Sequence, residues 1–423
     1  MQHLFHHTTR GPSVDTNDGS RKADPRMAWA ADYLAVNDTI VAVSIAVFVI
    51  TLGEHLWRQF LPKYLEALGA PIVAIGLFGT AEDALDGVYQ YPGGWLGDRL
   101  GRRNALMLFV SIAAVGYATY WWAPSWPWVF VGLLLVMGWS SMASPALFAL
   151  IGDTLPRGRR SMGFTVQSLM KRVSIAVAPT LGGVLIAGRG LIPGVRAALL
   201  ASIGLAAVTV MACARISVPR LADPGRTRIA AVWTSLPRDL RRLLLSDVFI
   251  RTCERMVDVF VVLYCTNVIG IRVPQFGALI AVQMLAASAS YLPAARLADR
   301  LGRKPFVVAT FMFFAIFPIA IMLSRGPGSL MAAFVIGGLR ELGEPARKAM
   351  IVDMVRPALR ARSVGLYYLL RSLAVSPAAF AGGLLWRMTP AMPFAVAGAI
   401  GVVGTLICAL TVDERQISVE HVL

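Results

Sequence analysis

Twelve long apolar segments follow one another along this chain, separated by short polar connections. Each offers roughly the 20 apolar residues that an α-helix needs to cross the hydrocarbon core of a bilayer. We expect these helices at residues 40–62, 71–95, 104–122, 127–151, 162–187, 193–214, 244–268, 275–297, 304–323, 328–352, 363–387 and 392–412. Charged residues make up 15% of the chain, whereas a soluble domain averages about 25%. The sequence therefore predicts an all-α membrane protein that is embedded in the lipid bilayer.

Basic residues are unevenly divided between the connections. They gather at residues 99–103, 157–160, 215–243, 300–304 and 356–362, while the alternate connections contain few. The positive-inside rule places the basic connections in the cytoplasm, so both termini are expected there, with the helices in the cell inner (plasma) membrane. The same rule accounts for the net charge of +16. No aromatic and basic RNA-recognition motif is visible, so no nucleic-acid partner is expected.

The sequence carries no sign of catalysis. Cys213, Cys253, Cys265 and Cys408 lack the spacing of metal ligands or of a redox pair. Neither a phosphate-binding loop nor a nucleophile motif is present. We therefore expect no catalytic residue, no cofactor and no metal site, and the chain is predicted not to be an enzyme.

The two halves of the chain repeat each other at an offset near two hundred residues. Residues 93–103 read GGWLGDRLGRR, and residues 294–304 read AARLADRLGRK. Glu54, Phe60 and Tyr64 recur as Glu254, Phe260 and Tyr264, and residues 144–153 correspond to residues 344–353. The expected organisation is a disordered cytoplasmic tail (1–39), a six-helix bundle (40–214), a cytoplasmic linker (215–243), a second six-helix bundle (244–412) and a cytoplasmic tail (413–423). Two parallel repeats of this kind are a transporter architecture.

The duplicated stretch resembles the loop motif G-x-x-x-D-R-x-G-R-[RK] of the major facilitator superfamily. The first copy supplies Gly94, Asp98, Arg99, Gly101, Arg102 and Arg103, and the second supplies Asp299, Arg300, Gly302, Arg303 and Lys304, with Ala295 in place of the first glycine. The resemblance covers residues 40–412 and implies the twelve-helix fold of that family. It also implies a monomer that moves a small-molecule solute by alternating access.

The motif has an implied role in gating. Asp98 is expected at the inner end of helix 2, where its charge suits the positive N-terminus of a neighbouring helix; in the family this neighbour is helix 11. The resemblance further implies the pairs Arg102 with Asp153 and Arg303 with Asp353, and a contact of Asp299 with the start of helix 5. These contacts would close the cytoplasmic side. The alternative, a solvated basic turn, leaves the acids, the glycines and the duplication unexplained.

Several charged residues lie inside the expected helices, where each costs about 2.5–3.5 kcal/mol on insertion scales. They must therefore face a wet cavity or one another. Helix 1 carries Glu54 and Arg58 one turn apart, and helix 2 carries Glu82, Asp83 and Asp86. Like charge and burial both favour the protonated form of a carboxyl group, so we expect Asp86 or Glu82 to couple proton movement to transport. Asp83 points partly elsewhere and could meet a base of another helix.

Helices 7 and 10 carry charges of both signs. They are Arg251, Glu254, Arg255 and Asp258 on helix 7, and Arg340, Glu341, Glu344, Arg347 and Lys348 along one face of helix 10. These residues either line the solute path or neutralise each other within their helices. Arg347 and Lys348 are expected to extend toward the cytoplasm. The candidates for solute binding or proton coupling are Glu54, Arg58, Glu82, Asp86, Glu254, Arg255, Asp258, Arg340 and Glu344.

The mode of transport stays open. Helix 5 resembles the family's antiporter motif G-x-x-x-G-P-x-x-G-G at Pro179, Gly182 and Gly183, although close helix packing explains small residues equally well. The family's arginine in the middle of helix 4 is missing, and Ser140, Ser141 and Ser144 occupy that region. Proton-coupled export of a small polar or charged molecule is the first hypothesis. The alternatives are proton-coupled uptake of a metabolite, and a sensor or assembly partner that transports nothing.

Overall fold

The computed structural model describes residues 38–144, 147, 160–215, 237–354 and 360–412. Most of these residues lie in helices, and no strand occurs within the described ranges. The two expected tails and most of the expected linker fall outside them. The prediction of an all-α protein is confirmed.

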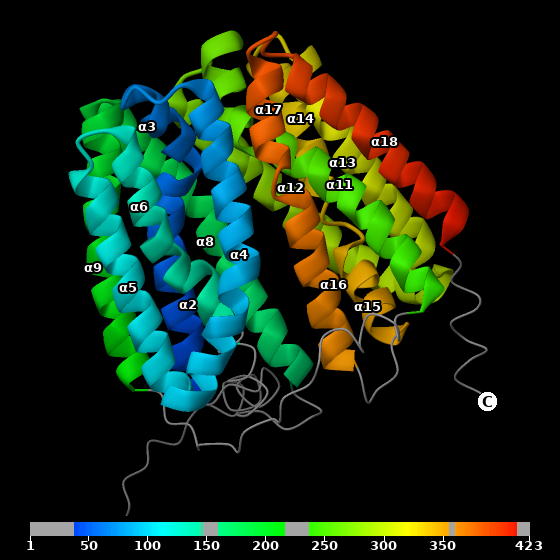
Figure 1. Ribbon diagram of the computed structural model, residues 1–423, viewed down its shortest axis with the longest axis horizontal. Coiled ribbons are helices and arrows are strands. Elements are labelled where there is room, and N and C mark those ends of the chain that lie inside the picture. The colour runs from blue at the N-terminus through cyan, green and yellow to red at the C-terminus, as the bar shows by residue number, and fades with distance from the viewer. Residues whose placement is uncertain (1–37, 145–146, 148–159, 216–236, 355–359, 413–423) are drawn as a thin grey trace, which may run out of the picture.

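The helices form two groups that lie side by side (Figure 1). The first group, from here on the first bundle, consists of α2 (Asp38–Trp57), η1 (Arg58–Phe60), α3 (Leu61–Ala67), α4 (Ile72–Leu100), α5 (Arg102–Trp122), α6 (Trp126–Met137), η2 (Gly138–Met142), α8 (Arg160–Arg189) and α9 (Leu191–Ala214). The second bundle consists of α11 (Arg238–Leu263), η4 (Tyr264–Val268), α12 (Val273–Leu301), α13 (Lys304–Leu323), α14 (Pro327–Leu339), α15 (Glu344–Asp353), α16 (Arg360–Val375), α17 (Ala378–Trp386) and α18 (Met392–Thr411). Together they account for the twelve segments that the sequence predicts.

Several expected helices are interrupted. The tenth is not continuous, because α14 and α15 are separated by a turn at residues 340–343. Pro345 has no N–H to donate to the carbonyl of residue 341, which weakens a continuous helix at this point. The N–H of Gly343 instead donates to Thr310 Oγ1 at 2.6 Å, which satisfies a donor that the break leaves free. The eleventh helix is likewise divided at Pro377, which precedes α17.

The repeat that the sequence predicts is visible as paired contacts. Tyr64 at the end of the first segment donates to the carbonyl of Tyr120 at 3.1 Å, and Tyr264 at the matching place donates to the carbonyl of Met322 at 3.2 Å. A Cβ added to Gly182 would lie 1.9 Å from the carbonyl oxygen of Leu56. Two hundred residues later, a Cβ on Gly382 would lie 2.2 Å from the carbonyl oxygen of Met256. The two bundles therefore share one packing scheme, down to the glycines that admit a neighbouring backbone.

The glycines of the duplicated motif have a backbone role. Gly101 (φ 81°) separates α4 from α5, and Gly302 (φ 93°) separates α12 from α13. A side chain strains this region of φ, whereas glycine enters it freely. The motif thus reverses the chain at the same point of both bundles.

The bundles meet mainly along two pairs of helices, α8 with α12 and α4 with α17. A Cβ on Gly183 would lie 2.9 Å from Pro274 Cα, and a Cβ on Gly383 would lie 3.2 Å from Val73 Cα. These contacts are again related by the two-hundred-residue offset. They lie near the end of the molecule that carries α3 and α17, which we call the opposite end (Figure 1). The other end, where α5 and α13 begin with Arg102 and Lys304, is called the basic end.

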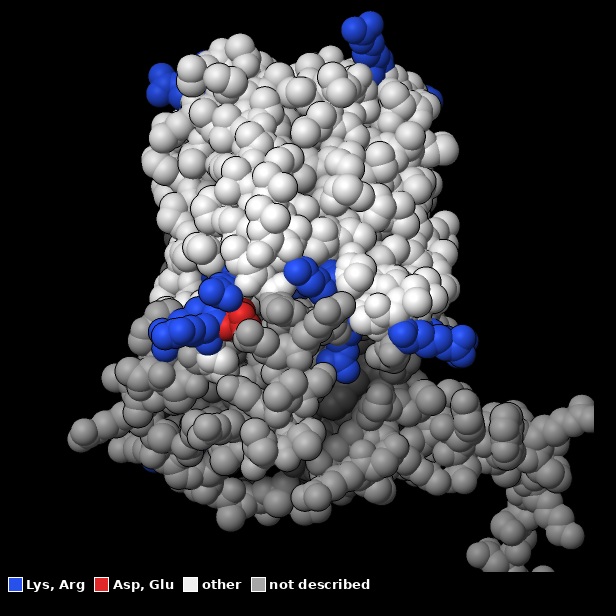
Figure 2. Space-filling model, turned by 90° about the vertical axis from the view of Figure 1, so that its right-hand side faces the viewer, with Lys and Arg blue, Asp and Glu red and all other residues white. Residues whose placement is uncertain are grey.

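The outer surface is that of a membrane protein. By length and composition, seven helices within the described ranges could cross a bilayer unaided. Leu410 is 80% exposed and Leu323 68% exposed, which suits contact with lipid. Figure 2 shows a broad band free of charged groups, with Lys and Arg gathered toward its two ends. The helices α4 and α11 are also long enough to cross, but they carry the charged residues described next.

Candidate functional site

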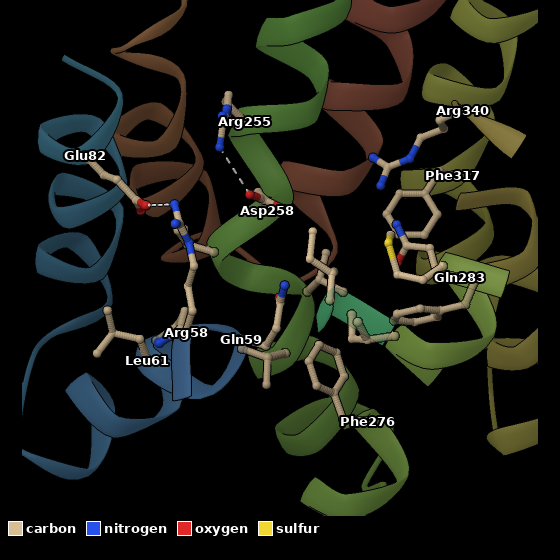
Figure 3. A pocket seen from close by; sticks show the side chains of 18 of the residues that line it. Arg58, Gln59, Leu61, Glu82, Arg255, Asp258, Phe276, Gln283, Phe317 and Arg340 are labelled. Carbon is tan, nitrogen blue, oxygen red and sulfur yellow. Dashed lines mark hydrogen bonds and ion pairs between the residues drawn. The ribbon is translucent and has the colours of Figure 1, made fainter. Parts of the chain in front are cut away.

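A cavity of about 150 Å³ lies between the two bundles (Figure 3). Arg58 and Glu82 line it from the first bundle, and Arg255, Asp258 and Arg340 line it from the second. All five belong to the set that the sequence singles out. Aromatic and aliphatic side chains complete the wall, so the cavity combines charge with apolar surface.

Arg58 binds two carboxylates at the edge of this cavity. Its guanidinium donates to Glu54, one turn earlier, and to Glu82 on α4. Glu54 is 4% exposed, and a buried carboxylate without a partner is strongly destabilising. Arg58 therefore satisfies Glu54 and also joins the end of the first segment to α4.

A second arginine connects the bundles. Arg255 Nε on α11 lies 3.2 Å from Asp83 Oδ1 on α4, and Arg255 Nη1 donates to Asp258 Oδ2 at 3.4 Å. Arg255 is thus the base from another helix that the sequence leads us to expect for Asp83. The Asp258 side chain is 57% exposed and faces the cavity.

Asp86 differs from the other acids of α4. Ser141 in the π-helical segment η2 donates to its Oδ1 at 2.5 Å, and Gln90 donates to its Oδ2 at 3.5 Å. In the described part of the chain no cation pairs with it. Of the three acids between residues 82 and 86, Glu82 and Asp83 are held by arginines and Asp86 is held by neutral donors.

The second bundle contains a buried ion-pair network that centres on Asp247 of α11, a residue that the sequence analysis missed. Asp247 has no exposed surface. Its Oδ2 accepts from Arg347 at 2.7 Å, from Tyr367 at 2.9 Å and from Arg371 at 3.4 Å. The signal was present in the spacing, because Asp247, Arg251 and Glu254 follow one another at four and three residues within one expected helix.

Glu344 extends this network from α11 to α15. Arg347 Nη2 donates to Glu344 at 2.8 Å, and Arg251 donates both to Glu344 and, at 2.8 Å, to Glu254. Arg347 is 2% exposed, so the expectation that it extends toward the cytoplasm is wrong. The two buried carboxylates offer its guanidinium charge-assisted hydrogen bonds inside the protein, and water is not needed.

The break between α14 and α15 corrects the expected single charged face of helix 10. Arg340, before the break, lines the cavity. Glu341, within it, accepts from Arg172 of α8 at 3.1 Å. Glu344, after it, belongs to the buried network. The pairs Arg172 with Glu341 and Arg255 with Asp83 are thus two ionic contacts between the bundles.

A further polar contact joins the bundles at the opposite end. Lys63 of α3 donates to Glu66 at 2.7 Å and to the side-chain oxygen of Asn267, and the Asn267 amide donates back to Glu66 at 2.7 Å. We call Lys63, Glu66 and Asn267 the opposite-end triad. No sequence pattern indicates this contact, because Asn267 lies about two hundred residues from Lys63 and Glu66.

The expected gate at the basic end is only partly described. Gly94 lies within α4, Arg102 begins α5, and Arg303 immediately precedes α13. Asp153 lies outside the described residues, and so do the side chains of Asp98, Asp299 and Asp353. The pairings that the resemblance implies for them remain predictions.

Similar proteins were found by sequence. An uncharacterized MFS-type transporter of Methanocaldococcus jannaschii is 20% identical over 375 residues, which cover 85% of this chain and 91% of that protein. The quinolone resistance protein NorA of Staphylococcus aureus is 26% identical over 150 residues, which cover 35% of this chain and 38% of NorA.

Solved structures show the same fold at low identity. A POT family transporter in complex with 5-aminolevulinic acid matches with a TM-score of 0.75 and 14% identity, over 89% of this chain and 96% of that one. The nucleoside transporter NupG matches with a TM-score of 0.74 and 12% identity, over 88% and 98%.

The family model of the Major Facilitator Superfamily matches residues 43–269 and again residues 243–421. These ranges cover most of the chain, and the relatives found with it are transporters, not enzymes. The cavity between two repeated bundles is also where transporters of this architecture hold their solutes. This chain therefore belongs to the Major Facilitator Superfamily and is a multi-pass secondary transporter.

Proposed function

We propose that the protein carries a small, charged organic solute across the cell membrane by alternating access, and that protons drive the solute out of the cell. The observation that carries this proposal is the cavity, which both bundles line with charged side chains. A solute held there would contact both bundles, so movement of one bundle against the other would change the side to which it is exposed.

The orientation follows from the basic residues. If the basic end faces the cytoplasm, both termini lie there and the opposite-end triad faces outward. The backbone contacts of Gly183 and Gly383 between the bundles, together with the opposite-end triad, then keep the outer side closed in this conformation. Opening the cavity outward requires Lys63 and Glu66 to separate from Asn267.

Export is favoured by the similarity to NorA, a protein named for quinolone resistance. The small residues of α8 add little to this argument. Gly182 and Gly183 are both needed for packing, against Leu56 and Pro274 respectively, so their match to an antiporter motif has a structural explanation.

Asp86 is our candidate for proton coupling. Glu82 and Asp83 each pair with an arginine, whereas Asp86 has neutral partners. Ser141 can rotate its hydroxyl between donating to a carboxylate and accepting from a carboxylic acid. Asp86 can therefore exchange a proton without leaving an arginine unpaired.

Solute counterflow in proteoliposomes tests the transport proposal. Purified protein is reconstituted, and vesicles loaded with each unlabelled member of a panel of charged, zwitterionic and neutral compounds are diluted into a trace of the same labelled compound. Transient uptake of label identifies a substrate. A pH gradient of either sign then distinguishes export from uptake. Folded protein that exchanges no member of a broad panel would instead favour a sensor or assembly role.

A further inference from the structure

The three arginines that line the cavity are not equally occupied. Arg58 holds two carboxylates, and Arg255 holds Asp83 and Asp258. Arg340 Nη1 is 3.8 Å from Glu254 Oε1, which is beyond hydrogen-bonding distance. In the described part of the chain, Arg340 is thus the cavity arginine without a hydrogen-bonded carboxylate.

Glu254 is also engaged elsewhere. Its other oxygen accepts from Arg251 at 2.8 Å, and Arg251 continues into the buried network. The network and its neighbours contain three acids and four arginines, namely Asp247, Glu254, Glu344, Arg251, Arg340, Arg347 and Arg371. This side of the cavity consequently carries one excess formal positive charge, and Arg340 is its member at the cavity wall.

Arg340 is held firmly although its charge is not neutralised by a close pair. Its Nε donates to the carbonyl of Gly337 at 2.9 Å, and its guanidinium lies over the rings of Phe314 and Phe317, at 5.0 and 4.3 Å from their centroids. The side chain is 11% exposed. The two terminal nitrogens make no hydrogen bond within the described residues, while guanidinium donors in such a dry setting bind a planar anion strongly.

The other side of the cavity has the reverse balance. Arg58 forms ion pairs with Glu54 and Glu82, and Arg255 forms ion pairs with Asp83 and Asp258. Each group has two carboxylates for one guanidinium. Lys171 also acts on Glu54, so the excess formal negative charge lies with Asp83 and Asp258 around Arg255. Asp258 is the most exposed of these acids. Figure 3 shows Glu82 and Arg340 on opposite sides of the cavity, with Asp258 between them.

An apolar wall lies beside these charges. The rings of Phe276, Phe334 and Phe317, from α12, α14 and α13, meet edge to face with centroids 5.9 Å apart at both contacts. All three line the cavity together with Ile280 and Met284. This surface fits an aromatic or aliphatic group.

We propose that the solute is a zwitterion with an apolar body. Arg340 binds its carboxylate or similar anionic group, Asp258 binds its ammonium group, and the wall of Phe276 and Phe334 receives the apolar part. This inference rests on the proposed transport function and names the class of solute that the site takes.

Binding of three matched compounds tests the assignment. They are L-phenylalanine, 2-phenylethylamine, which lacks the carboxylate, and 3-phenylpropionate, which lacks the amine. Apparent Kd values for the purified full-length protein are obtained from titrated shifts in melting temperature at constant ionic strength. The zwitterion should bind more tightly than either single-charge compound. A hydrogen bond to a charged group contributes about 1.5–3 kcal/mol, so loss of either charge should weaken binding roughly 10-fold to 100-fold.

Two variants assign the charges to residues. Arg340→Gln should weaken L-phenylalanine and 3-phenylpropionate and leave 2-phenylethylamine unchanged, whereas Asp258→Asn should weaken L-phenylalanine and 2-phenylethylamine. Should Arg340→Gln fail to fold, Arg340→Lys keeps the charge but loses the planar fork, and a smaller loss with the same selectivity is expected. Equal effects of Arg340→Gln on all three compounds, or a single-charge compound that binds wild type as tightly as the zwitterion, would overturn the inference. No binding of any of the three would overturn it as well.

Counterflow separates this outcome from failure of the transport proposal. If a solute with a single charge is exchanged and Arg340→Gln exchanges it at the wild-type rate, the zwitterion assignment is wrong and the transport function stands. If no solute of any class is exchanged, the transport function itself fails.

Discussion

In the first bundle, Glu82 and Asp83 are paired with arginines and Asp86 is left with neutral partners, whereas in the second bundle Asp247 and Glu344 are buried against several arginines. The packing of the two bundles is nevertheless the same, as Gly182 with Leu56 and Gly382 with Met256 show. The two repeated bundles thus share their helix packing but differ in the positions and partners of their charged residues. We infer that Asp86 has a role in transport and that the buried acids of the second bundle, Asp247 and Glu344, stabilise its fold.

The largest effect is expected at the centre of the buried network. Asp247→Ala leaves Arg347 buried without its closest acid, and breaking a buried pair in this way costs about 3–5 kcal/mol. The variant should have a strongly lowered melting temperature or fail to give monodisperse protein. Asp239→Ala on the same helix is the control, since its partner Arg242 is 54% exposed and such pairs contribute about 1 kcal/mol or less. Equal melting temperatures for the two variants would show that the network does not stabilise the second bundle.

A smaller and symmetric effect is expected at the repeated glycines. Gly182→Ala and Gly382→Ala each force a methyl group against a backbone carbonyl, and overpacking of this kind costs about 1–3 kcal/mol. The two losses in thermal stability should be similar. Gly204→Ala, in open space on α9, should be neutral or slightly stabilising. If one of the paired glycines accepts alanine without loss, the bundles do not share the packing scheme described above.

The smallest effect is expected at the opposite-end triad. Asn267→Ala removes two hydrogen bonds between the bundles, and exposed polar pairs contribute roughly 0.2–1 kcal/mol, so the population open at this end should rise about fivefold at most. Labelling of a cysteine at Val262, which lines the cavity, by an impermeant reagent from the outer side measures the change. Arg325→Ala at the same end is the control. An unchanged labelling rate would show that the triad does not hold this end closed.

The helices and their arrangement in two repeats could be predicted well from the sequence. Each membrane-spanning helix is indicated by the length of its apolar segment, and the repeat is indicated by matching residues in the two halves. The motif glycines 101 and 302 occupy the turns where the duplication placed them. The break between α14 and α15 at residues 340–343 was not predicted, although Pro345 lies next to it. An apolar segment long enough to cross the membrane does not show whether its helix is continuous.

The site was harder to predict, because its contacts join distant parts of the chain. Residue types and helical spacing pointed to Arg58, Glu82, Arg255, Asp258 and Arg340, which do line one cavity. Spacing within one helix cannot show that Glu82 faces Arg58 or that Arg347 faces Asp247. Ser141, noted only as a departure from the family pattern, is the hydrogen-bond donor to Asp86.

The most direct test of the contrast between the bundles is proton flux through the Asp86→Asn variant, measured with a pH-sensitive dye in proteoliposomes beside solute counterflow. Asp239→Asn, the same substitution at an acid near the start of α11 whose partner Arg242 is exposed, should behave as wild type in both measurements. Asp86→Asn should exchange solute without a gradient, because binding and movement of the bundles remain. It should no longer move protons with the solute or accumulate solute in response to a pH gradient. Accumulation by Asp86→Asn at the wild-type level would show that Asp86 is not the coupling carboxyl group.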